Sequence, residues 1–369
     1  MNDELFMRRA LELAAKGRGQ VSPNPMVGAV IVKNGEVVGE GYHTYAGLHH
    51  AEIIALQQAA ASAKEATCYV TLEPCCHYGR TPPCSKALIN AGISRVVVAM
   101  SDPNPMVAGR GIEELRTAGI QTHVGVLRKE AEKLNEIFIK YITSKRPFIH
   151  LKSAITLDGK IATRRGHSRW ITSEASRYRS QLLRAEYDAI AVGSGTVLAD
   201  DPELTLRIAA DRHRPLHRVI LDRRLRTPVN ARLFRNSAPV SIFACELHAA
   251  SYHGKTRLKE TVEALTERGA KVIFCPQEDY LRSVLDRLSE MQITSLIVEG
   301  GSEINWQFIT HSYVDKLTLF VAPLTVGGTS APSFIGGQGF DTLSQALRFK
   351  IESVSQLDTD ICIVAYPTT

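Results

Sequence analysis

The sequence predicts an α/β protein of two domains, and three observations support that prediction. The chain has 369 residues, which is too long for one ordinary domain and enough for two. Strand patterns alternate with helical patterns along the chain, as in layered α/β domains. The polar segment Thr143-Ser144-Lys145-Arg146-Pro147 has the composition of a short linker. We therefore expect one domain over 1–146 and a second over 147–369.

Composition and charge restrict the class of protein. The apolar fraction of 44% is normal for a globular chain, and no long apolar run predicts a membrane span. The acidic start, Met1-Asn2-Asp3-Glu4, does not resemble a secretion signal. Seven unevenly placed cysteines favour a reducing compartment. We therefore expect a cytoplasmic protein.

The net charge of +6 is divided evenly between the two halves. There are 17 basic and 14 acidic residues up to Arg146, and 27 basic and 24 acidic residues after it, so each half carries +3. Neither half is basic enough to suggest a nucleic-acid-binding domain. Arginine is nevertheless dense between Arg146 and Arg235, where a few guanidinium groups could clamp phosphates.

The first half alternates helices and strands in a regular order. Asn2 or Asp3 can cap a first helix that ends at Gly17, and Asn34-Gly35 is a strong hairpin signal. In chain order the patterns predict strands over 27–33 and 36–42, a helix from 52 to 61, strand 67–72, helix 85–90, strand 95–100, a helix over 111–117 and a helix over 129–141.

Two short stretches in this half predict a catalytic zinc site. His50-Ala51-Glu52 offers an imidazole and a carboxylate, while Cys75 and Cys84 offer two thiolates. Three protein ligands leave the fourth position of tetrahedral zinc open for water, and a nearby carboxylate can act as general acid and base. His-x-Glu and Pro-Cys are also the signature of zinc deaminases, which space their cysteines two residues apart. Here eight residues separate them, and we expect this longer loop to face the substrate.

The sequence leaves some alternatives open. Cys76 or His77 could complete a closed structural zinc site, in which Glu52 would have no chemical role. His49 in place of His50 would break the His-x-Glu spacing. Cys68 lies in the middle of a strand and is expected in the core.

The second half is also rich in strands. The patterns predict strand 148–155, a turn over 157–160, a helix starting near 172–174, strands over 188–193, 218–222, 240–245, 272–275 and 295–299, a helix that ends at 308, and strands over 317–321 and 361–364. No strand is followed by G-x-G-x-x-G, so a Rossmann domain is not predicted. Glu299-Gly300-Gly301-Ser302 could receive a phosphate, although a plain tight turn explains it equally well.

The first half resembles the cytidine-deaminase-like superfamily, which implies a three-layer domain. The segments that carry a closer likeness, to the pyrimidine deaminases of riboflavin biosynthesis, are Ser22-Pro23-Asn24-Pro25-Met26-Val27-Gly28 and the stretch from Leu72 to Cys84. A long loop between the cysteines is normal in that family. The resemblance implies a zinc ion on His50, Cys75 and Cys84. It further implies that the pyrimidine and its ribose phosphate are held by Asn24, His43, Arg80 and Thr81.

The second half is similar to the reductases of the same pathway, which have a dihydrofolate-reductase-like fold and use NADPH. The likeness lies in Lys152-Ser153-Ala154, 157–162, 168–172, 193–196, 200–207 and 298–301. It implies cofactor contacts at Ala154, Trp170, Thr196, Asp200, Gly301 and Ser302. It implies substrate contacts at Ser168, Arg184, Leu204, Arg207 and Glu299.

Residue chemistry agrees with part of this assignment. Arg184 and Arg207 suit a ribose 5-phosphate, and Glu299 suits hydroxyl or ring N–H donors. Lys152 and Asp200 are candidates for proton transfer near the hydride acceptor. Trp170 could instead be a core residue.

The two resemblances together imply a bifunctional enzyme that acts on a phosphorylated pyrimidine and forms a homo-oligomer. One alternative is a deaminase of bases in RNA, which would leave the second half unexplained. Another is a non-enzymatic zinc-stabilised binding module, in which Glu52 would be dispensable.

Overall fold

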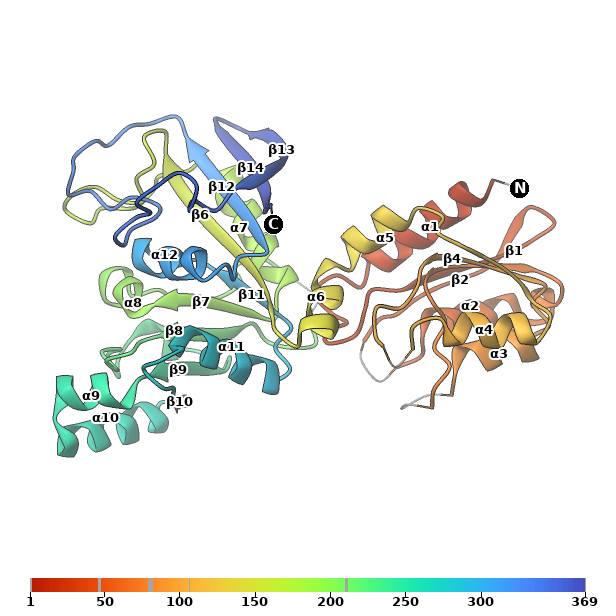
Figure 1. The fold of residues 1–369 in the computed structure, drawn as a ribbon, viewed down its shortest axis with the longest axis horizontal. Helices are drawn as coiled ribbons and strands as arrows, with labels where there is room; N and C mark the ends of the chain where they lie inside the picture. The colour runs from red at the N-terminus through yellow and green to blue at the C-terminus, as the bar shows by residue number, and fades with distance from the viewer. Residues whose placement is uncertain (1, 46–47, 79–81, 106, 210–211, 369) are drawn as a thin grey trace. The chain divides into compact units, whose positions relative to one another are not determined.

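The strands of the chain form two separate sheets, one in each half (Figure 1). This computed structural model describes residues 2–45, 48–78, 82–105, 107–209 and 212–368. It divides into two compact units, Met1–Arg146 and Pro147–Thr369. In the part of the chain that is described, no helix has the length and hydrophobicity needed to cross a lipid bilayer.

The sheet of the first unit has five strands in the order β2-β1-β3-β4-β5. Its strands are β1 (Gly28–Lys33), β2 (Glu36–Tyr42), β3 (Thr67–Leu72), β4 (Arg95–Met100) and β5 (Gln121–Val124). β1 pairs antiparallel with β2 and β3, whereas β3, β4 and β5 are parallel. Asn34 and Gly35 close the β1–β2 hairpin with positive φ angles of 53° and 87°, which is why this pair of residues suits the turn.

Helices cover both faces of this sheet. They are α1 (Asp3–Ala15), α2 (Ala51–Ala59), α3 (Cys84–Asn90), α4 (Arg110–Thr117), α5 (Arg128–Leu134) and α6 (Glu136–Ser144), with a short 3₁₀ turn η1 (Ala60–Ala63). One core joins α2, α3 and α4 to one face, and another joins α1 and α5 to the opposite face. The predicted three-layer arrangement is therefore confirmed, and Cys68 is fully buried within it.

The prediction of one helix over 129–141 is wrong in one respect. The segment forms two helices, α5 and α6, which meet at Asn135. The Asn135 side chain is buried and pairs with the backbone of Met26 in both directions. It accepts from Met26 N at 2.8 Å and donates to Met26 O at 2.9 Å. A contact across 109 residues fixes this break, so local periodicity could not show it.

The sheet of the second unit has nine strands in the order β10-β9-β8-β7-β11-β6-β12-β14-β13. They are β6 (Phe148–Thr156), β7 (Ala189–Gly193), β8 (His217–Leu221), β9 (Val240–Ala244), β10 (Ala270–Phe274), β11 (Ser295–Val298), β12 (Lys316–Ala322), β13 (Phe349–Leu357) and β14 (Asp360–Pro367). The strands from β10 to β12 are parallel, and β14 and β13 extend the sheet with antiparallel pairs.

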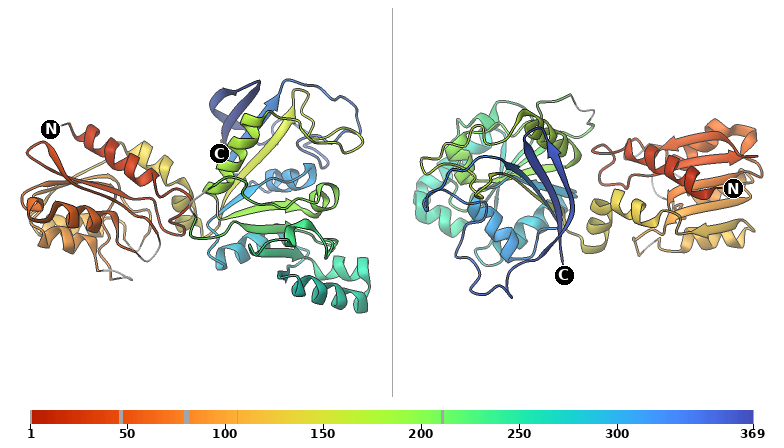
Figure 2. Two further views of the ribbon diagram at one scale, coloured as in Figure 1. Left: turned by 180° about the vertical axis from the view of Figure 1, so that it is seen from behind. Right: turned by 90° about the horizontal axis from the view of Figure 1, so that it is seen from above.

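Helices lie on both faces of this sheet as well. They are α7 (Glu174–Glu186), α8 (Ser194–Asp200), α9 (Glu246–His253), α10 (Lys255–Glu267), α11 (Tyr280–Glu290) and α12 (Ser302–Thr310), with a 3₁₀ turn η2 (Arg232–Phe234). Residues of α11 and α12 pack into the apolar core over the central strands, while α7 lies on the opposite face (Figures 1 and 2). The carboxyl ends of β6, β7 and β11 lead into segments that carry predicted site residues.

Several elements of the second unit are not predicted. The helices α8 to α11 are absent from the sequence-based assignment, as are β13 and, in the first unit, β5. β13 is exposed along nearly its whole length, so it lacks the alternating burial that marks a strand in a sequence. α8 begins with Ser194-Gly195-Thr196, which is poor helix-forming chemistry.

Candidate active sites

In the first unit, the folding of three elements brings His50, Cys75 and Cys84 together. His50 caps α2, Cys75 follows the end of β3, and Cys84 is the first residue of α3. His50 Nδ1 lies 3.2 Å from Cys84 Sγ and 3.6 Å from Cys75 Sγ. All three ligand atoms lie within 4.8 Å of one another, and no other described His, Cys, Asp or Glu belongs to this cluster.

These three residues fit a zinc ion. With Zn–S bonds of about 2.3 Å and Zn–N bonds of about 2.0 Å, neighbouring ligand atoms of a tetrahedral site lie roughly 3.5–3.8 Å apart. The distances of 3.2 and 3.6 Å are close to that spacing. A hydrogen bond from Cys84, with support from His50, holds the pKa of the Cys75 thiol well below its usual value, so one ligand is already poised as a thiolate.

Glu52 lies in the first turn of α2, two residues after His50, and only 3% of it is exposed. Burial, reinforced by the neighbouring Cys75, raises the pKa of its carboxyl group to about 7. A carboxyl group in such an environment can both take and give a proton near neutral pH. The structure thus places a proton carrier directly beside the candidate metal ligands.

Glu73 organises the loop that carries Cys75, and the sequence did not point to it. This buried carboxylate accepts hydrogen bonds of 2.9–3.3 Å from the backbone N–H groups of Asp102, Gly109, Gly111 and Ile112. A Cβ at Gly111 would lie 2.0 Å from the carbonyl oxygen of Pro74. Glycine is therefore needed where α4 approaches the Pro74-Cys75 segment.

Ser85 holds the other end of the same segment. Its hydroxyl lies 3.1 Å from the carbonyl oxygen of Cys75 and 2.5 Å from a carboxylate oxygen of Glu114. The backbone N–H of Ser85 also donates to Cys75 O at 3.2 Å. These contacts join the two cysteine segments, so the ligand geometry is fixed by the protein itself.

Asn24 and His43 lie beside the ligand cluster. Their Nδ2 and Nε2 atoms are 3.1 Å apart, and the rings of His43 and His50 make an edge-on contact with centroids 5.4 Å apart. Burial lowers the pKa of His43. Its Nδ1 faces the carbonyl oxygen of His49 at 3.3 Å and must donate there, so its Nε2 accepts from Asn24.

The loop that carries Asn24 is fixed by Asn135, another residue that the sequence did not identify. The two hydrogen bonds between Asn135 and Met26 attach the loop to the junction of α5 and α6. The helical pattern over 129–141 shows no interruption at Asn135, so the sequence offered no local signal for this role. The partner of Asn135 is visible only in three dimensions.

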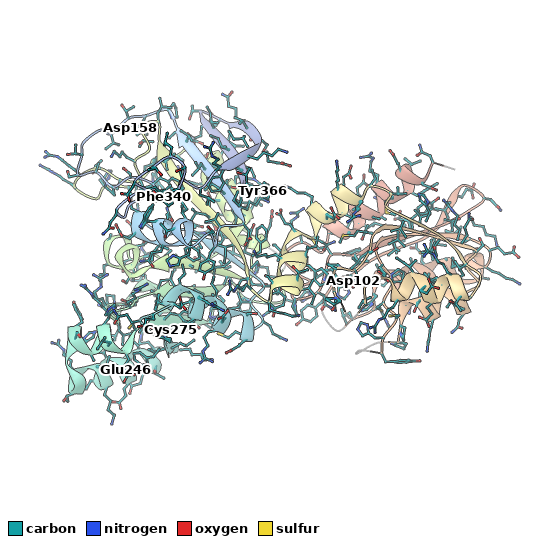
Figure 3. The ribbon with its side chains drawn as sticks, in the orientation of Figure 1. Asp102, Asp158, Glu246, Cys275, Phe340 and Tyr366 are labelled. Atoms are coloured by element: carbon teal, nitrogen blue, oxygen red, sulfur yellow. The ribbon has the colours of Figure 1, made fainter. Side chains whose placement is uncertain are left out.

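The loop after β4 brings a further acid near this site. Asp102, labelled in Figure 3, accepts from the backbone N–H of Asn104 at 2.8 Å. Burial raises its pKa to about 6. Arg80 and Thr81, which the family resemblance implies as substrate contacts, lie outside the residues that the structure describes.

In the second unit, Lys152, Arg184 and Glu299 form a buried ion cluster. Lys152 comes from β6, Arg184 from α7, and Glu299 from the end of β11. Arg184 donates through Nε at 2.6 Å and through a terminal nitrogen at 3.0 Å to the two oxygens of Glu299. Lys152 Nζ donates to Glu299 at 3.3 Å.

The electrostatics of this cluster fix the charge of Glu299. Burial alone would oppose its ionisation, but Arg184 and Lys152 outweigh that effect and hold the pKa of Glu299 well below its usual value. Burial lowers the pKa of Lys152. The arrangement joins a permanent anion to an amine that gives up its proton more readily than usual.

A cavity of about 600 Å³ lies in the same unit. Five of the predicted site residues line it: Ser168, Thr196, Asp200, Gly301 and Ser302. The Ser168 hydroxyl donates to Asp200 at 3.3 Å. The volume of this cavity suits a cofactor or small-molecule ligand.

The remaining predicted residues lie outside the lining of that cavity. Ala154 lies on β6 two residues beyond Lys152. Trp170 is 62% exposed, with the Arg177 guanidinium 4.6 Å from its ring centroid, so it is not a core residue. Leu204 is buried with a positive φ of 52°, and Arg207 is exposed while its backbone N–H donates to Gln181 at 2.9 Å.

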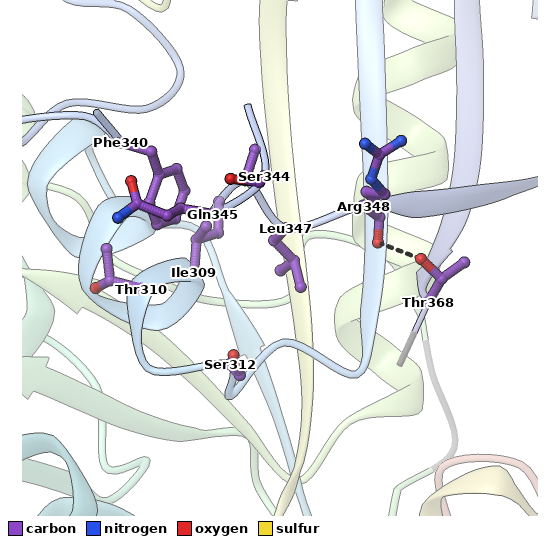
Figure 4. A pocket seen from close by; sticks show the side chains of 10 residues that line it. Ile309, Thr310, Ser312, Phe340, Ser344, Gln345, Leu347, Arg348 and Thr368 are labelled. Carbon is purple, nitrogen blue, oxygen red and sulfur yellow. Dashed lines mark hydrogen bonds between the residues drawn. The ribbon is translucent and has the colours of Figure 1, made fainter. Parts of the chain in front are cut away.

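A smaller cavity of about 260 Å³ lies between the end of α12 and the segment before β13 (Figure 4). Arg348 is its one charged lining residue, and the carbonyl oxygen of Arg348 accepts from the Thr368 hydroxyl at 3.3 Å. None of the predicted site residues lines this cavity.

Comparison with known families agrees with this division of the chain. Residues 1–100 match the family model described as the cytidine and deoxycytidylate deaminase zinc-binding region. Residues 147–363 match the RibD C-terminal domain. The fold and the sites therefore define a two-domain enzyme, a zinc-binding deaminase joined to a reductase with a dihydrofolate-reductase-like fold.

Relatives and solved structures extend over the whole chain. The riboflavin biosynthesis protein RibD of Aquifex aeolicus is 44% identical over 98% of this chain and 97% of its own length. RibD of Escherichia coli is 40% identical over 98% and 99%. The structure of Acinetobacter baumannii RibD matches with a TM-score of 0.87 and 39% identity over 100% of this chain and 99% of that one. The chain belongs to the RibD family of deaminase–reductases of riboflavin biosynthesis.

A Thermotoga maritima structure is equally similar. It has a TM-score of 0.87 and 39% identity, and it covers 99% of each chain. That protein is described as a diaminohydroxyphosphoribosylaminopyrimidine deaminase and 5-amino-6-(5-phosphoribosylamino)uracil reductase.

Proposed function

We propose that the chain catalyses two successive reactions on one phosphorylated pyrimidine. The first is hydrolytic removal of the 2-amino group of 2,5-diamino-6-(5-phosphoribosylamino)-4(3H)-pyrimidinone. The second is reduction of the ribose side chain to ribityl with NADPH. The observation that carries the proposal is the buried Glu52 beside a cluster of three metal ligands. The two activities described for the Thermotoga maritima protein support it.

In the deaminase unit, His50, Cys75 and Cys84 would hold the zinc ion. A zinc ion bound there would supply an activated water for the hydrolysis. Glu52 takes a proton from the attacking water and passes it to the amine that leaves as ammonia. Asn24 and His43, whose side chains contact each other at 3.1 Å, hold the pyrimidine. Arg80 and Thr81 are assigned to the ribose phosphate.

In the reductase unit, a bound nicotinamide cofactor would supply the hydride for ribose C1. The ring oxygen that leaves C1 needs a proton, and Lys152 is our first candidate to give it, because burial already weakens its hold on the proton. Asp200 is the second candidate. Glu299 accepts hydrogen bonds from the substrate and is kept ionised by Arg184.

Other predicted residues complete the reductase assignment. Ser168, Leu204 and Arg207 contact the substrate, and the exposed guanidinium of Arg207 is available for the ribose phosphate. Ala154, Trp170, Thr196, Asp200, Gly301 and Ser302 contact the cofactor. We also assign the protein to the cytoplasm as a homo-oligomer, in line with its free cysteines and its family resemblance.

The direct test is an assay of the purified full chain with the diaminopyrimidine phosphate. We expect one zinc per chain, one ammonia released per substrate, and one NADPH oxidised per ammonia released. Ammonia release without any NADPH oxidation would contradict the reductase assignment, and the absence of both products would contradict the proposal as a whole.

A further inference from the structure

The segment 201–207 carries two residues assigned to the substrate, Leu204 and Arg207, and it belongs to no helix or strand. Leu204 is buried with a positive φ of 52°, a backbone conformation that residues other than glycine seldom adopt. The ladder of hydrogen bonds that stabilises a helix or a strand is therefore not what holds this segment. Its conformation depends on contacts with neighbouring elements.

Helix α7 holds the end of the segment. The backbone N–H of Arg207 donates to the side-chain oxygen of Gln181 at 2.9 Å. A terminal nitrogen of Arg184 donates to Thr205 O at 3.0 Å, and the same guanidinium group pairs with Glu299. The end of the segment is thus attached directly to the buried ion cluster.

Arg232 holds the start of the segment. Its backbone N–H donates to a carboxylate oxygen of Asp201 at 2.8 Å, and its guanidinium group donates to Glu203 at 2.5 Å. Arg235 also lies 4.0 Å from Glu203. Alternate residues along the segment, at 201, 203, 205 and 207, are therefore held from two sides.

Arg232 itself belongs to a well-anchored turn. It is the first residue of η2, in which Leu233 and Phe234 are buried. The fully buried Arg218 of β8 donates to the carbonyl oxygens of Leu233 and Ala238. These contacts fix η2 against the sheet, so Arg232 holds the segment 201–207 from a fixed position.

We propose that Arg232, acting through Glu203, is a positioning residue of the reductase reaction, which holds the segment 201–207 so that Leu204 and Arg207 meet the phosphorylated pyrimidine. The inference rests on the proposed function, in which these two residues contact the substrate. Neither Arg232 nor Glu203 lines the large cavity, so the pair acts through the segment.

The exposure of this ion pair separates its role in positioning from a role in folding. The Arg232 and Glu203 side chains are 39% and 35% exposed, and ion pairs as exposed as this contribute little to folding stability. A binding group displaced by about 1 Å can nevertheless lower a reaction rate by about a hundredfold. Loss of the pair should therefore affect the substrate more than the fold.

The test is the steady-state rate of NADPH oxidation on deaminated substrate, measured on the full chain. The variants are Arg232→Gln, Arg232→Lys, Glu203→Gln and the double variant with glutamine at both positions. The dissociation constant of NADP⁺, measured by isothermal titration calorimetry, reports on the cofactor separately. Arg287→Gln is the matched control, because it breaks an exposed ion pair with Glu290, 2.9 Å long, outside the cavity lining.

We expect Arg232→Gln and Glu203→Gln each to raise the KM for deaminated substrate by about tenfold, because the segment that binds it is no longer held in place. The dissociation constant of NADP⁺ and the control variant should stay unchanged. Since the two side chains act through one contact, the double variant should lose no more than either single variant. Arg232→Lys keeps the charge and should recover most of the wild-type KM.

Three results would overturn the inference while leaving the reductase assignment in place. They are an unchanged KM in either glutamine variant, a loss in the double variant equal to the product of the single losses, and an equal rise in the KM and in the dissociation constant of NADP⁺. Failure of the wild-type chain to oxidise NADPH on this substrate would overturn the proposed function as well.

Discussion

At the residue scale, the two active sites place buried carboxylates in opposite environments. Burial, reinforced by the neighbouring Cys75, raises the pKa of Glu52 to about 7. Glu299 is buried as well, but Arg184 and Lys152 hold its pKa well below the usual value. One residue can therefore carry a proton at neutral pH, and the other stays an anion throughout.

Replacement of Lys152 tests whether the ion cluster has a catalytic role or only a structural one. We predict that Lys152→Met lowers the turnover of NADPH oxidation by about 10²–10⁴-fold, the usual contribution of a general acid. The Arg184–Glu299 pair remains in this variant, so the unit should stay folded. Steady-state assays on deaminated substrate test this, with ammonia release as the internal control. Turnover close to that of the wild type would show that Lys152 is not the proton donor.

The sequence predicted the candidate deaminase residues better than the residues that hold them in position. His50 and Glu52 have the His-x-Glu spacing of the zinc-deaminase signature and Cys75 follows a proline as in that signature, and the structure gathers His50, Cys75 and Cys84. Glu73 and Asn135 act through partners 29 to 109 residues away. No local pattern marks such contacts. The sequence likewise suggested a substrate contact for Arg184 but did not predict its ion pair with Glu299, 115 residues away.

At the scale of elements, Glu73 connects β3 to the loop after β4 and to the start of α4. In Glu73→Gln one side-chain oxygen becomes an N–H₂ group that faces two backbone N–H donors. We predict that the unfolding free energy falls by about 2–4 kcal/mol, because buried donors lose their acceptor. Urea denaturation followed by circular dichroism measures this. Glu113→Gln, an exposed change on the same helix, should cost less than about 0.5 kcal/mol.

The first helix is attached to the sheet by a charged contact that depends on pH. Arg95 donates to both oxygens of Asp3, at 2.7 and 2.8 Å, and this lowers the pKa of Asp3 from 3.8 to about 2. Since the folded pKa lies below the unfolded value, the contribution is complete above about pH 4 and is lost as the pH falls toward 2.

We therefore predict that Asp3→Asn destabilises the protein by about 0.5–1 kcal/mol at pH 7, a small value because the pair is partly exposed and screened. The difference between the variant and the wild type should shrink at pH 3. Urea unfolding of both proteins at the two pH values measures it. A difference that grows on acidification would contradict this account of Asp3.

The strands were predicted more completely than the helices for a physical reason. Buried parallel strands such as β4 and β7 are continuous apolar runs, which a sequence displays directly. The break between α5 and α6 depends on Asn135 and Met26, and β13 carries no buried face. Elements that depend on distant partners or on exposure leave little trace in local composition.

At the scale of the whole molecule, each unit has its own sheet, its own core and its own candidate site. The metal ligands all lie in the first unit and the ion cluster lies in the second. It should therefore be possible to abolish the reaction of one unit while the reaction of the other unit continues.

Removal of the metal tests this separation. We predict that treatment with a zinc chelator abolishes ammonia release, while NADPH oxidation on deaminated substrate continues at its original rate. Readdition of zinc should restore ammonia release. Loss of NADPH oxidation after chelation would show that the second unit also depends on the metal.

The central claim is that Glu52 serves only the deaminase reaction of a two-reaction enzyme. The most direct measurement is the rate of both reactions in Glu52→Gln, with bound zinc measured in the same preparation. We predict that ammonia release falls by at least about 10²–10⁴-fold, that zinc stays bound, and that NADPH oxidation on deaminated substrate is unchanged. Loss of both activities, or of neither, would contradict the assignment of the two reactions to the two units.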